Sequence, residues 1–116
     1  MTKKLSLLAG LLACAAAFAA DYRLDLGTSV RHGTLEVAPR ITGPAGKALR
    51  YEMVVTRESQ GGKSNRRQSG SVRLDESGTA QLASNSMSVS SRDSYRVEVR
   101  VFDDDQLVAH ETARHP

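Results

Sequence analysis

The residue types that most often carry out chemistry occur in this chain, but their spacing does not build a site. His32, His110 and His115 are scattered, and none has a second ligand at metal-binding spacing, so we expect no metal site. The run Asp103-Asp104-Asp105 lacks the further carboxylates that a calcium loop needs. It therefore predicts a tight hairpin turn.

The sequence also lacks a complete phosphate-binding loop and a complete serine-nucleophile motif. Gly61-Gly62-Lys63-Ser64 has part of a phosphate-binding loop, but the first glycine of that motif is missing and no helical pattern follows. No Gly-x-Ser-x-Gly elbow is present, and no histidine and acid can be matched to a serine. We expect no catalytic residue, no cofactor and no enzymatic activity.

The chemistry that remains is surface charge. One polar stretch carries five cations, namely Arg57, Lys63, Arg66, Arg67 and Arg73. Two alternating stretches carry Arg50, Glu52, Arg96, Glu98 and Arg100 at the positions expected to face outward, which form a mainly positive face if the two strands are neighbours. Such charges prevent edge-to-edge aggregation, and they also suit an acidic, strand-forming partner. The two interpretations are compatible, since a protein that handles aggregating chains must not join them.

The elements that position these cations are short strands. In 49–56 apolar residues alternate with polar ones at a period of two, which predicts a strand with one buried face. Gln60, Gly61 and Gly62 supply a turn, and the return limb from Ser64 is so polar that we expect it at the edge of a sheet.

The rest of the chain continues this pattern. Further runs with strand character occupy 22–26, 33–41, 80–89, 95–101 and 107–113. Pro39 predicts a bulge or an edge, the serine-rich segment 84–94 predicts a solvated loop, and Asp93 with Tyr95 suits a tyrosine corner. No amphipathic helix is evident. The sequence predicts an all-β, seven-stranded sandwich of the immunoglobulin or fibronectin III type.

The first twenty residues have the build of a secretory signal. Lys3 and Lys4 precede an apolar run that is too short for a membrane-spanning helix, and small residues lead to Ala20. We therefore expect a signal peptide at 1–20 and one domain at 21–116, with Cys14 as an alternative lipoprotein processing site. The net charge is +3, so loss of the two lysines leaves about +1, which does not favour nucleic acid as a partner. The mature chain has no cysteine, and we expect a monomer stabilised by packing.

The hairpin also carries a family resemblance. Arg57-Glu58, the Gly62-x-Ser64 turn and Gln68 follow the alternating strand, and Glu36-Val37-x-Pro39 lies upstream. In these motifs and their order the chain resembles the curli assembly proteins related to CsgC and CsgH, the thin aggregative fimbriae synthesis proteins. The resemblance covers nearly all of the mature chain. One branch of the family carries a Cys-x-Cys pair where this chain has Ala48 and Arg50, so a redox role does not carry over.

The resemblance implies a periplasmic protein with a seven-stranded immunoglobulin-like fold. It implies a chaperone-like activity, without cofactor or ATP, that keeps acidic curli amyloid subunits from polymerising before export. Contacts of this kind between exposed charges are individually weak, so we expect transient binding. The residues predicted to bind the partner are Arg50, Arg57, Lys63, Arg66, Arg67, Arg96 and Arg100. The residues that match the family motif are Arg57, Glu58, Ser64 and Gln68, of which the last two also suit a role in shaping the hairpin.

Two other functions fit the same sequence. One is a structural or adhesive module of the cell surface, which would be incorporated stably into fibres or the outer membrane. The other is a small inhibitor of a secreted enzyme that acts through the Gly61-Gly62 loop. Replacing Arg66 and Arg67 by alanine should weaken fibre inhibition and leave an inhibitor of that kind mostly intact.

Overall fold

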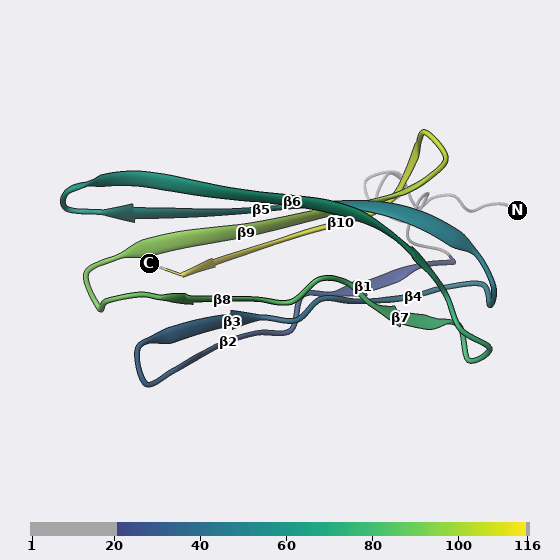
Figure 1. The fold of residues 1–116 in the computed structure, drawn as a ribbon, viewed down its shortest axis with the longest axis horizontal. Helices are drawn as coiled ribbons and strands as arrows, with labels where there is room; N and C mark the ends of the chain where they lie inside the picture. Colours follow the sequence, from purple (N-terminus) through teal and green to yellow (C-terminus); the bar gives the residue numbers. More distant parts are fainter. Residues whose placement is uncertain (1–20, 116) are drawn as a thin grey trace, which may run out of the picture.

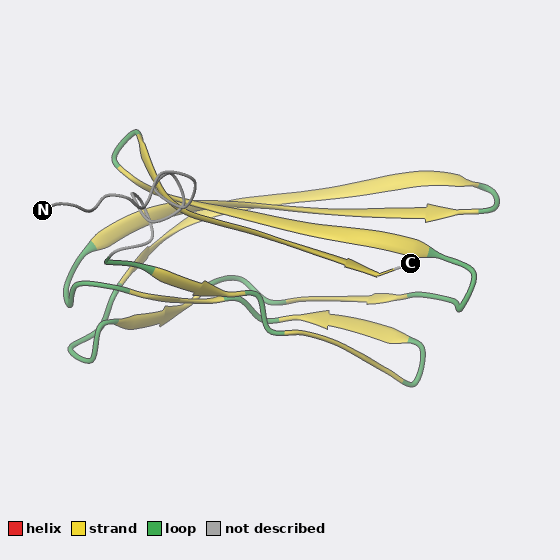
Figure 2. Ribbon diagram, turned by 180° about the vertical axis from the view of Figure 1, so that it is seen from behind, coloured by secondary structure: helices red, strands yellow, loops and turns green. Residues whose placement is uncertain are grey.

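A computed structural model describes residues 21–115 of the chain, and the predicted signal peptide lies outside them. The described part consists of ten strands in three antiparallel sheets, joined by turns and loops (Figures 1 and 2). The expected all-β class is confirmed, whereas the expected count of seven strands is not. Residues 21–115 contain no helix with the length and apolar character needed to cross a membrane.

One layer of the molecule is a four-stranded sheet in the order β10-β9-β5-β6. Its strands are β5 (Ala48–Ser59), β6 (Gly62–Arg73), β9 (Ser94–Asp103) and β10 (Gln106–His115). The predicted hairpin is confirmed, because β5 and β6 pair along their whole length across the Gln60-Gly61 turn, and β6 is an edge strand as expected. The predicted acidic turn joins β9 to β10, and a register shift between Leu107 and Ala109 interrupts the pairing of those two strands.

The other layer is made of two short three-stranded sheets that lie end to end in Figure 1. One contains β1 (Arg23–Asp25), β4 (Arg40–Thr42) and β7 (Thr79–Gln81). The second contains β2 (Thr28–Arg31), β3 (Thr34–Val37) and β8 (Asn85–Ser88). Two of the seven predicted strands, 33–41 and 80–89, are thus each divided in two, and β2 is an additional strand, which gives ten.

The three interruptions between the two short sheets lie side by side and are linked by backbone hydrogen bonds. Gly27 has a φ of 57° and separates β1 from β2, and its carbonyl accepts the Ala38 N–H at 3.2 Å. A side chain there would meet the Ala38 carbonyl oxygen, so the site requires glycine. Pro39 separates β3 from β4, because it has no N–H to donate, and its carbonyl accepts the Leu82 N–H at 2.9 Å. Pro39 therefore interrupts its strand as predicted, but in the middle of the layer and not at an edge.

Three local expectations are wrong. The strand β2 was not expected, because all four of its residues are exposed and show no alternation. The serine-rich segment 84–94 is not all a solvated loop, because it contains β8, which falls within the predicted run 80–89 and in which Met87 packs against the core. The tyrosine corner lacks its defining hydrogen bond, since the buried Tyr95 hydroxyl has no partner among residues 21–115 and the ring stacks on His115 at 5.0 Å.

The core lies between the two layers. Alternate residues of β5 and β9 point inward, and Met53, Val55, Val97, Val99 and Val101 are at most 1% exposed. Leu35, Val37 and Ile41 face them from the opposite layer, as the sequence predicts. Burial of these side chains drives folding, and it leaves the intervening residues of the four-stranded sheet on its outer face.

A carboxylate closes the turn that leads from β6 to β7. Asp75 accepts hydrogen bonds from the Ser77 hydroxyl (2.6 Å), the Thr79 N–H (3.0 Å) and the Ser77 N–H (2.9 Å). These bonds favour the ionised form and hold the pKa of Asp75 at about 2. The turn is therefore stabilised by a charge that ordinary acidic conditions do not remove.

We predict that Asp75→Asn lowers the melting temperature at neutral pH. The pKa of Asp75 is depressed in the folded chain, so its contribution is fully present above the unfolded value of about 3.9 and is lost as the pH falls towards about 2. Thermal melts of both proteins between pH 2 and pH 7 measure this, with Glu76→Gln as the neighbouring exposed control. A difference in melting temperature that persists unchanged at pH 2 would contradict the prediction.

Candidate functional site

The outer face of the four-stranded sheet collects most of the predicted binding residues. The pairing of β5 with β9 confirms that the two alternating strands are neighbours. Cross-strand rows therefore run over the face, and successive rows hold His110-Arg100-Glu52-Ser69, Thr112-Glu98-Val54-Arg67 and Arg114-Arg96-Thr56-Asn65. Of the predicted binding residues, those on this face are Arg50, Lys63, Arg67, Arg96 and Arg100.

Each of the three glutamates on the face engages a predicted cation. Among residues 21–115, Arg50 pairs with Glu52 at 3.3 Å, Lys63 with Glu58 at 3.6 Å and Arg100 with Glu98 at 3.0 Å. Arg50 also lies over the Phe102 ring, 4.5 Å from its centroid. These cations are partly neutralised by their partners, so they contribute less positive potential than the sequence suggests.

Three arginines on the face have no ion pair in the described part of the chain, namely Arg67, Arg96 and Arg114. We call them the arginine patch. Arg96 and Arg114 are directly opposite each other on β9 and β10, and like charges in that arrangement are unfavourable. Arg67 lies on β6 in the adjacent row, opposite Val54 of β5. All three are exposed, so the patch concentrates positive charge without a direct ion pair among residues 21–115, although the charge of Arg96 also helps to lower the pKa of Glu98.

A hollow of about 400 Å³ adjoins the patch where β9 begins and β10 ends. Arg96 and Arg114 line it, together with the hydroxyls of Thr56 and Ser94 and with Lys63 and Glu58. Cationic and hydroxyl groups around a shallow hollow can hold carboxylates through hydrogen bonds as well as through charge. The arrangement suits acidic side chains of a polypeptide.

The remaining two predicted cations, Arg57 and Arg66, belong to the inner face. Arg57 is directly opposite Ser64, and Arg66 is opposite the buried Val55. The Arg57 guanidinium donates to the Ser88 carbonyl at 2.9 Å, and that of Arg66 donates to the Asn85 side-chain oxygen at 2.8 Å. Both arginines therefore connect the hairpin to β8 in the other layer. Their role in binding a partner stays a prediction.

Two of the four residues of the family motif, Arg57 and Gln68, take part in the same connection. The Gln68 side-chain oxygen accepts from the Asn85 amide at 2.8 Å, so Asn85 bridges Gln68 and Arg66. Ser64 is opposite Arg57, and Glu58 pairs with Lys63 beside the turn. Arg57 and Gln68 thus help to hold the hairpin on β8, whereas Glu58 and Ser64 make contacts within the hairpin, so the contacts of the motif support a structural role.

We predict that Asn85→Ala destabilises the fold by about 1–2 kcal/mol, because it removes two hydrogen bonds between the layers and leaves Gln68 without its partner. Urea unfolding measures the change. Ser86→Ala is the matched control, since Ser86 is the exposed neighbour on the same strand. Equal unfolding free energies for the two variants would show that the bridge contributes nothing.

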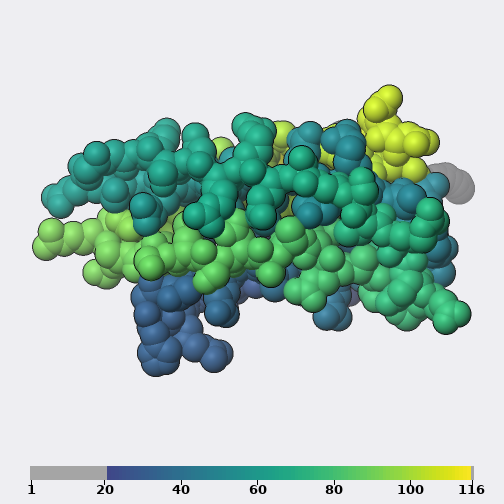
Figure 3. All heavy atoms as spheres, viewed as in Figure 1, coloured from purple at the N-terminus to yellow at the C-terminus, as the bar shows by residue number. Residues whose placement is uncertain are grey.

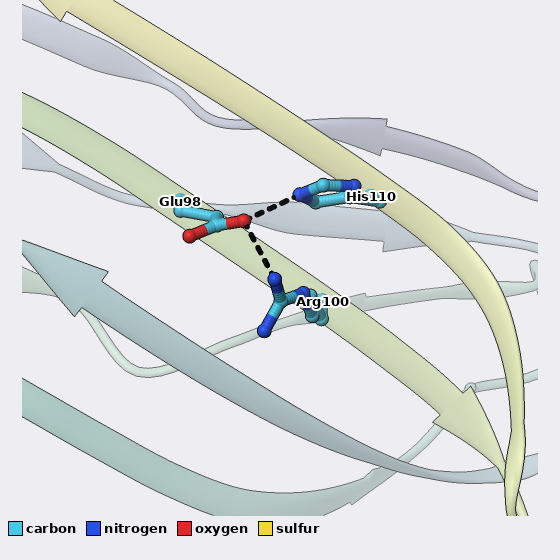
Figure 4. Close-up of polar contacts among 3 residues, drawn as sticks. All are labelled: Glu98, Arg100 and His110. Carbon is cyan, nitrogen blue, oxygen red and sulfur yellow. Dashed lines mark hydrogen bonds and ion pairs between the residues drawn. The ribbon is translucent and has the colours of Figure 1, made fainter.

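Glu98 is the acid that sets the charge balance at the centre of the face. One of its carboxylate oxygens lies 2.8 Å from the His110 ring nitrogen Nε2 and 3.0 Å from the Arg100 guanidinium (Figure 4). The hydrogen bond with His110 and the charge of Arg100 lower the pKa of Glu98, although partial burial opposes them. Glu98 is therefore ionised at neutral pH and offsets the cations around it.

We predict that Glu98→Gln lowers the melting temperature at neutral pH. Because the folded pKa of Glu98 is depressed, its stabilising effect is present above the unfolded value of about 4.3 and disappears as the pH falls through the folded pKa. Melts at several values between pH 2 and pH 7 test this, with Glu111→Gln as a control on the neighbouring strand. A difference between the wild type and Glu98→Gln that does not shrink as the pH falls would show that the proposed cause is wrong.

Sequence reasoning missed two residues, Arg114 and Asn85. Arg114 was missed because the last strand was expected to end at Ala113, one residue too early. Asn85 lies where the predicted strand 80–89 overlaps the segment 84–94 that was expected to be a solvated loop, and it was not proposed for any role. The inward direction of Arg57 and Arg66 could have been predicted from the sequence. Arg57 continues the inward, odd-numbered series of β5, and a two-residue turn pairs that series with the even-numbered residues of β6.

Within residues 21–115, no three His, Cys, Asp or Glu side chains group closely enough to hold a metal ion. The candidate site is thus a surface built from arginines, hydroxyls and one shallow hollow. Its cationic and hydroxyl groups are of the kind that can bind anions.

Comparisons with known proteins give a consistent result. The family described as thin aggregative fimbriae synthesis protein matches residues 15–112. The solved structure of the E. coli curli protein CsgC has a TM-score of 0.61 at 20% identity, covering 82% of this chain and 98% of that one. CsgH of R. palustris, solved in solution, has a TM-score of 0.60 at 16% identity, covering 80% and 89% respectively. No match is found among curated protein sequences.

Proposed function

The chain belongs to the thin aggregative fimbriae synthesis protein family, and from this premise we propose that it is a chaperone-like inhibitor of curli amyloid formation. It acts in the periplasm after export, without catalysis or a cofactor. Its clients are acidic curli subunits that have not yet been secreted. It binds them transiently and as a monomer.

The observation that carries the proposal is the arginine patch. Cations without a direct ion pair on one sheet face attract an acidic chain over a distance of about 10 Å at moderate salt, and they raise the rate of encounter. The direct juxtaposition of Arg96 and Arg114 costs stability, and local costs of this kind are common at functional sites. An acidic partner placed between the two arginines relieves the repulsion.

The proposal also explains why weak contacts suffice. Each exposed ion pair contributes only about 0–1 kcal/mol, so single subunits leave quickly. Small oligomers present several carboxylates at once, and their contacts act together. The protein therefore favours early oligomers over monomers, which allows a small amount of it to delay nucleation.

We extend the proposal to the architecture. The end-to-end pairs β1 with β2, β3 with β4 and β7 with β8 each correspond to one strand of an immunoglobulin-like sandwich that is interrupted, at Gly27, at Pro39 and at 82–84 respectively. The similarity of fold to CsgC and CsgH supports this interpretation.

We predict that substoichiometric wild-type protein lengthens the lag of curli-subunit fibrillation in a thioflavin assay at low salt. The triple variant Arg67→Ala, Arg96→Ala, Arg114→Ala should lose most of this delay, because it removes the arginine patch. The control Arg23→Ala, Arg31→Ala, Arg40→Ala removes equal charge from exposed positions of the other layer and should keep the delay.

Salt gives the second control. Raising the ionic strength to about 1 M shortens the screening length to about 3 Å and should abolish the delay by the wild type. A wild type that does not delay fibrillation at low salt, or a patch variant that delays it as well as the wild type, would refute the proposal.

A further inference from the structure

The strand β6 has one side without a backbone partner. It pairs with β5 along all twelve of its residues, from Gly62 opposite Ser59 to Arg73 opposite Ala48, with no register shift. No other described strand pairs with it. The space-filling view in Figure 3 shows the hairpin on the surface, beside the green segment that holds β7 and β8. A regular edge of this length is a template for a further strand.

The other edges of the described chain offer less. The strand β10 is the opposite edge of the same sheet, but its pairing shifts between Leu107 and Ala109, and it carries Glu111. Such irregularities are how natural sheets protect an edge. The edge strands β1, β2, β7 and β8 are three or four residues long. Regularity and length therefore single out β6.

The turn determines which groups of β6 face the open side. A two-residue loop closes on a pair that exchanges hydrogen bonds, here Ser59 and Gly62, and the bonding then alternates. We therefore expect Lys63, Asn65, Arg67 and Ser69 to direct their N–H and C=O groups to the free edge. These residues also carry the outward side chains of β6, so an added strand would meet backbone partners and cations together.

The charge of β6 identifies the kind of strand that fits. It contains Lys63, Arg66, Arg67 and Arg73 and no carboxylate. A second copy of the chain paired at this edge would bring four cations against four, which disfavours it. An extended segment with a carboxylate on every second residue is complementary, because some of its carboxylates are then four residues apart, which is the spacing of Lys63 and Arg67.

We propose that β6 accepts an extended acidic polypeptide segment as a fifth strand of the four-stranded sheet. The inference deepens the proposed function and rests on it for the identity of the client. It adds a mode of binding: the arginine patch attracts the acidic chain, and the β6 edge then holds it by backbone hydrogen bonds. The added strand lies next to Arg67, so both contacts can form in one complex.

The test uses a synthetic twelve-residue peptide of alternating glutamate and threonine as the probe, with a lysine and threonine peptide as its control. Ser69→Pro removes a donor that points to the free edge and places a ring against the incoming strand, and edge strands tolerate proline. Ser69→Ala is the matched control. We expect Ser69→Pro to bind the acidic peptide roughly tenfold more weakly than Ser69→Ala, as expected for the loss of one or two hydrogen bonds.

Amide hydrogen exchange of the wild type provides a readout that does not depend on a variant. Bound acidic peptide should slow exchange at Arg67, Ser69 and Ser71 and leave β10 unchanged. Equal affinity of the two Ser69 variants, or slowed exchange confined to other strands, would overturn the proposal. Dimerisation that buries β6 and is abolished by Ser69→Pro would also overturn it, because the edge would then belong to a second copy.

The fibrillation assay separates this inference from the proposed function. If Ser69→Pro delays fibrillation as the wild type does while the patch variant does not, edge binding is wrong and the proposed function stands. If the wild type binds the peptide along β6 but does not delay fibrillation, strand acceptance stands and the proposed function is wrong.

Discussion

The pairing of β5 with β9 is the constraint on which the rest of the structure depends. Their register places Met53 opposite Val99 and Val55 opposite Val97, so the apolar residues of both strands share one face. A slip of one residue would move this entire set to the solvent. The same register brings the charged residues between them together on the outer face. One pairing thus determines both the core and the candidate binding surface.

The cations of the hairpin divide into two groups with different physical roles. Arg57 and Arg66 each use a guanidinium to hold β8, and the bridging amide of Asn85 joins Gln68 to this connection. Arg67 lies on the other side of the same strand, without an ion pair in the described chain. The neighbouring residues Arg66 and Arg67 of β6 therefore have different roles: the first stabilises the contact between the layers, and the second contributes surface charge. A count of positive charges along the sequence does not separate them.

The sequence allowed prediction of the elements whose alternation was strong. The strands around Met53 and Val99, the Gly61 turn and the edge position of β6 all follow from period-two patterns and turn residues. The prediction failed where the pattern was weak. The strand β2 is fully exposed and was not expected, and the serine-rich residues of β8 favoured a loop over the strand predicted at 80–89; both strands are held by pairing with β3. Arg114 was missed for a related reason, since the end of a polar edge strand has no apolar residue to mark it.

The register shift in β10 limits the number of sheet edges at which the molecule can receive another strand. A protein with two regular open edges could receive a strand on one side and pass the pattern on from the other, as an amyloid layer does. Here one long edge is regular and the opposite one is interrupted between Leu107 and Ala109. If β6 receives an acidic strand as proposed, the molecule corresponds to what polymer chemists call a monofunctional end group, because the interrupted edge gives a growing chain no second site from which to continue.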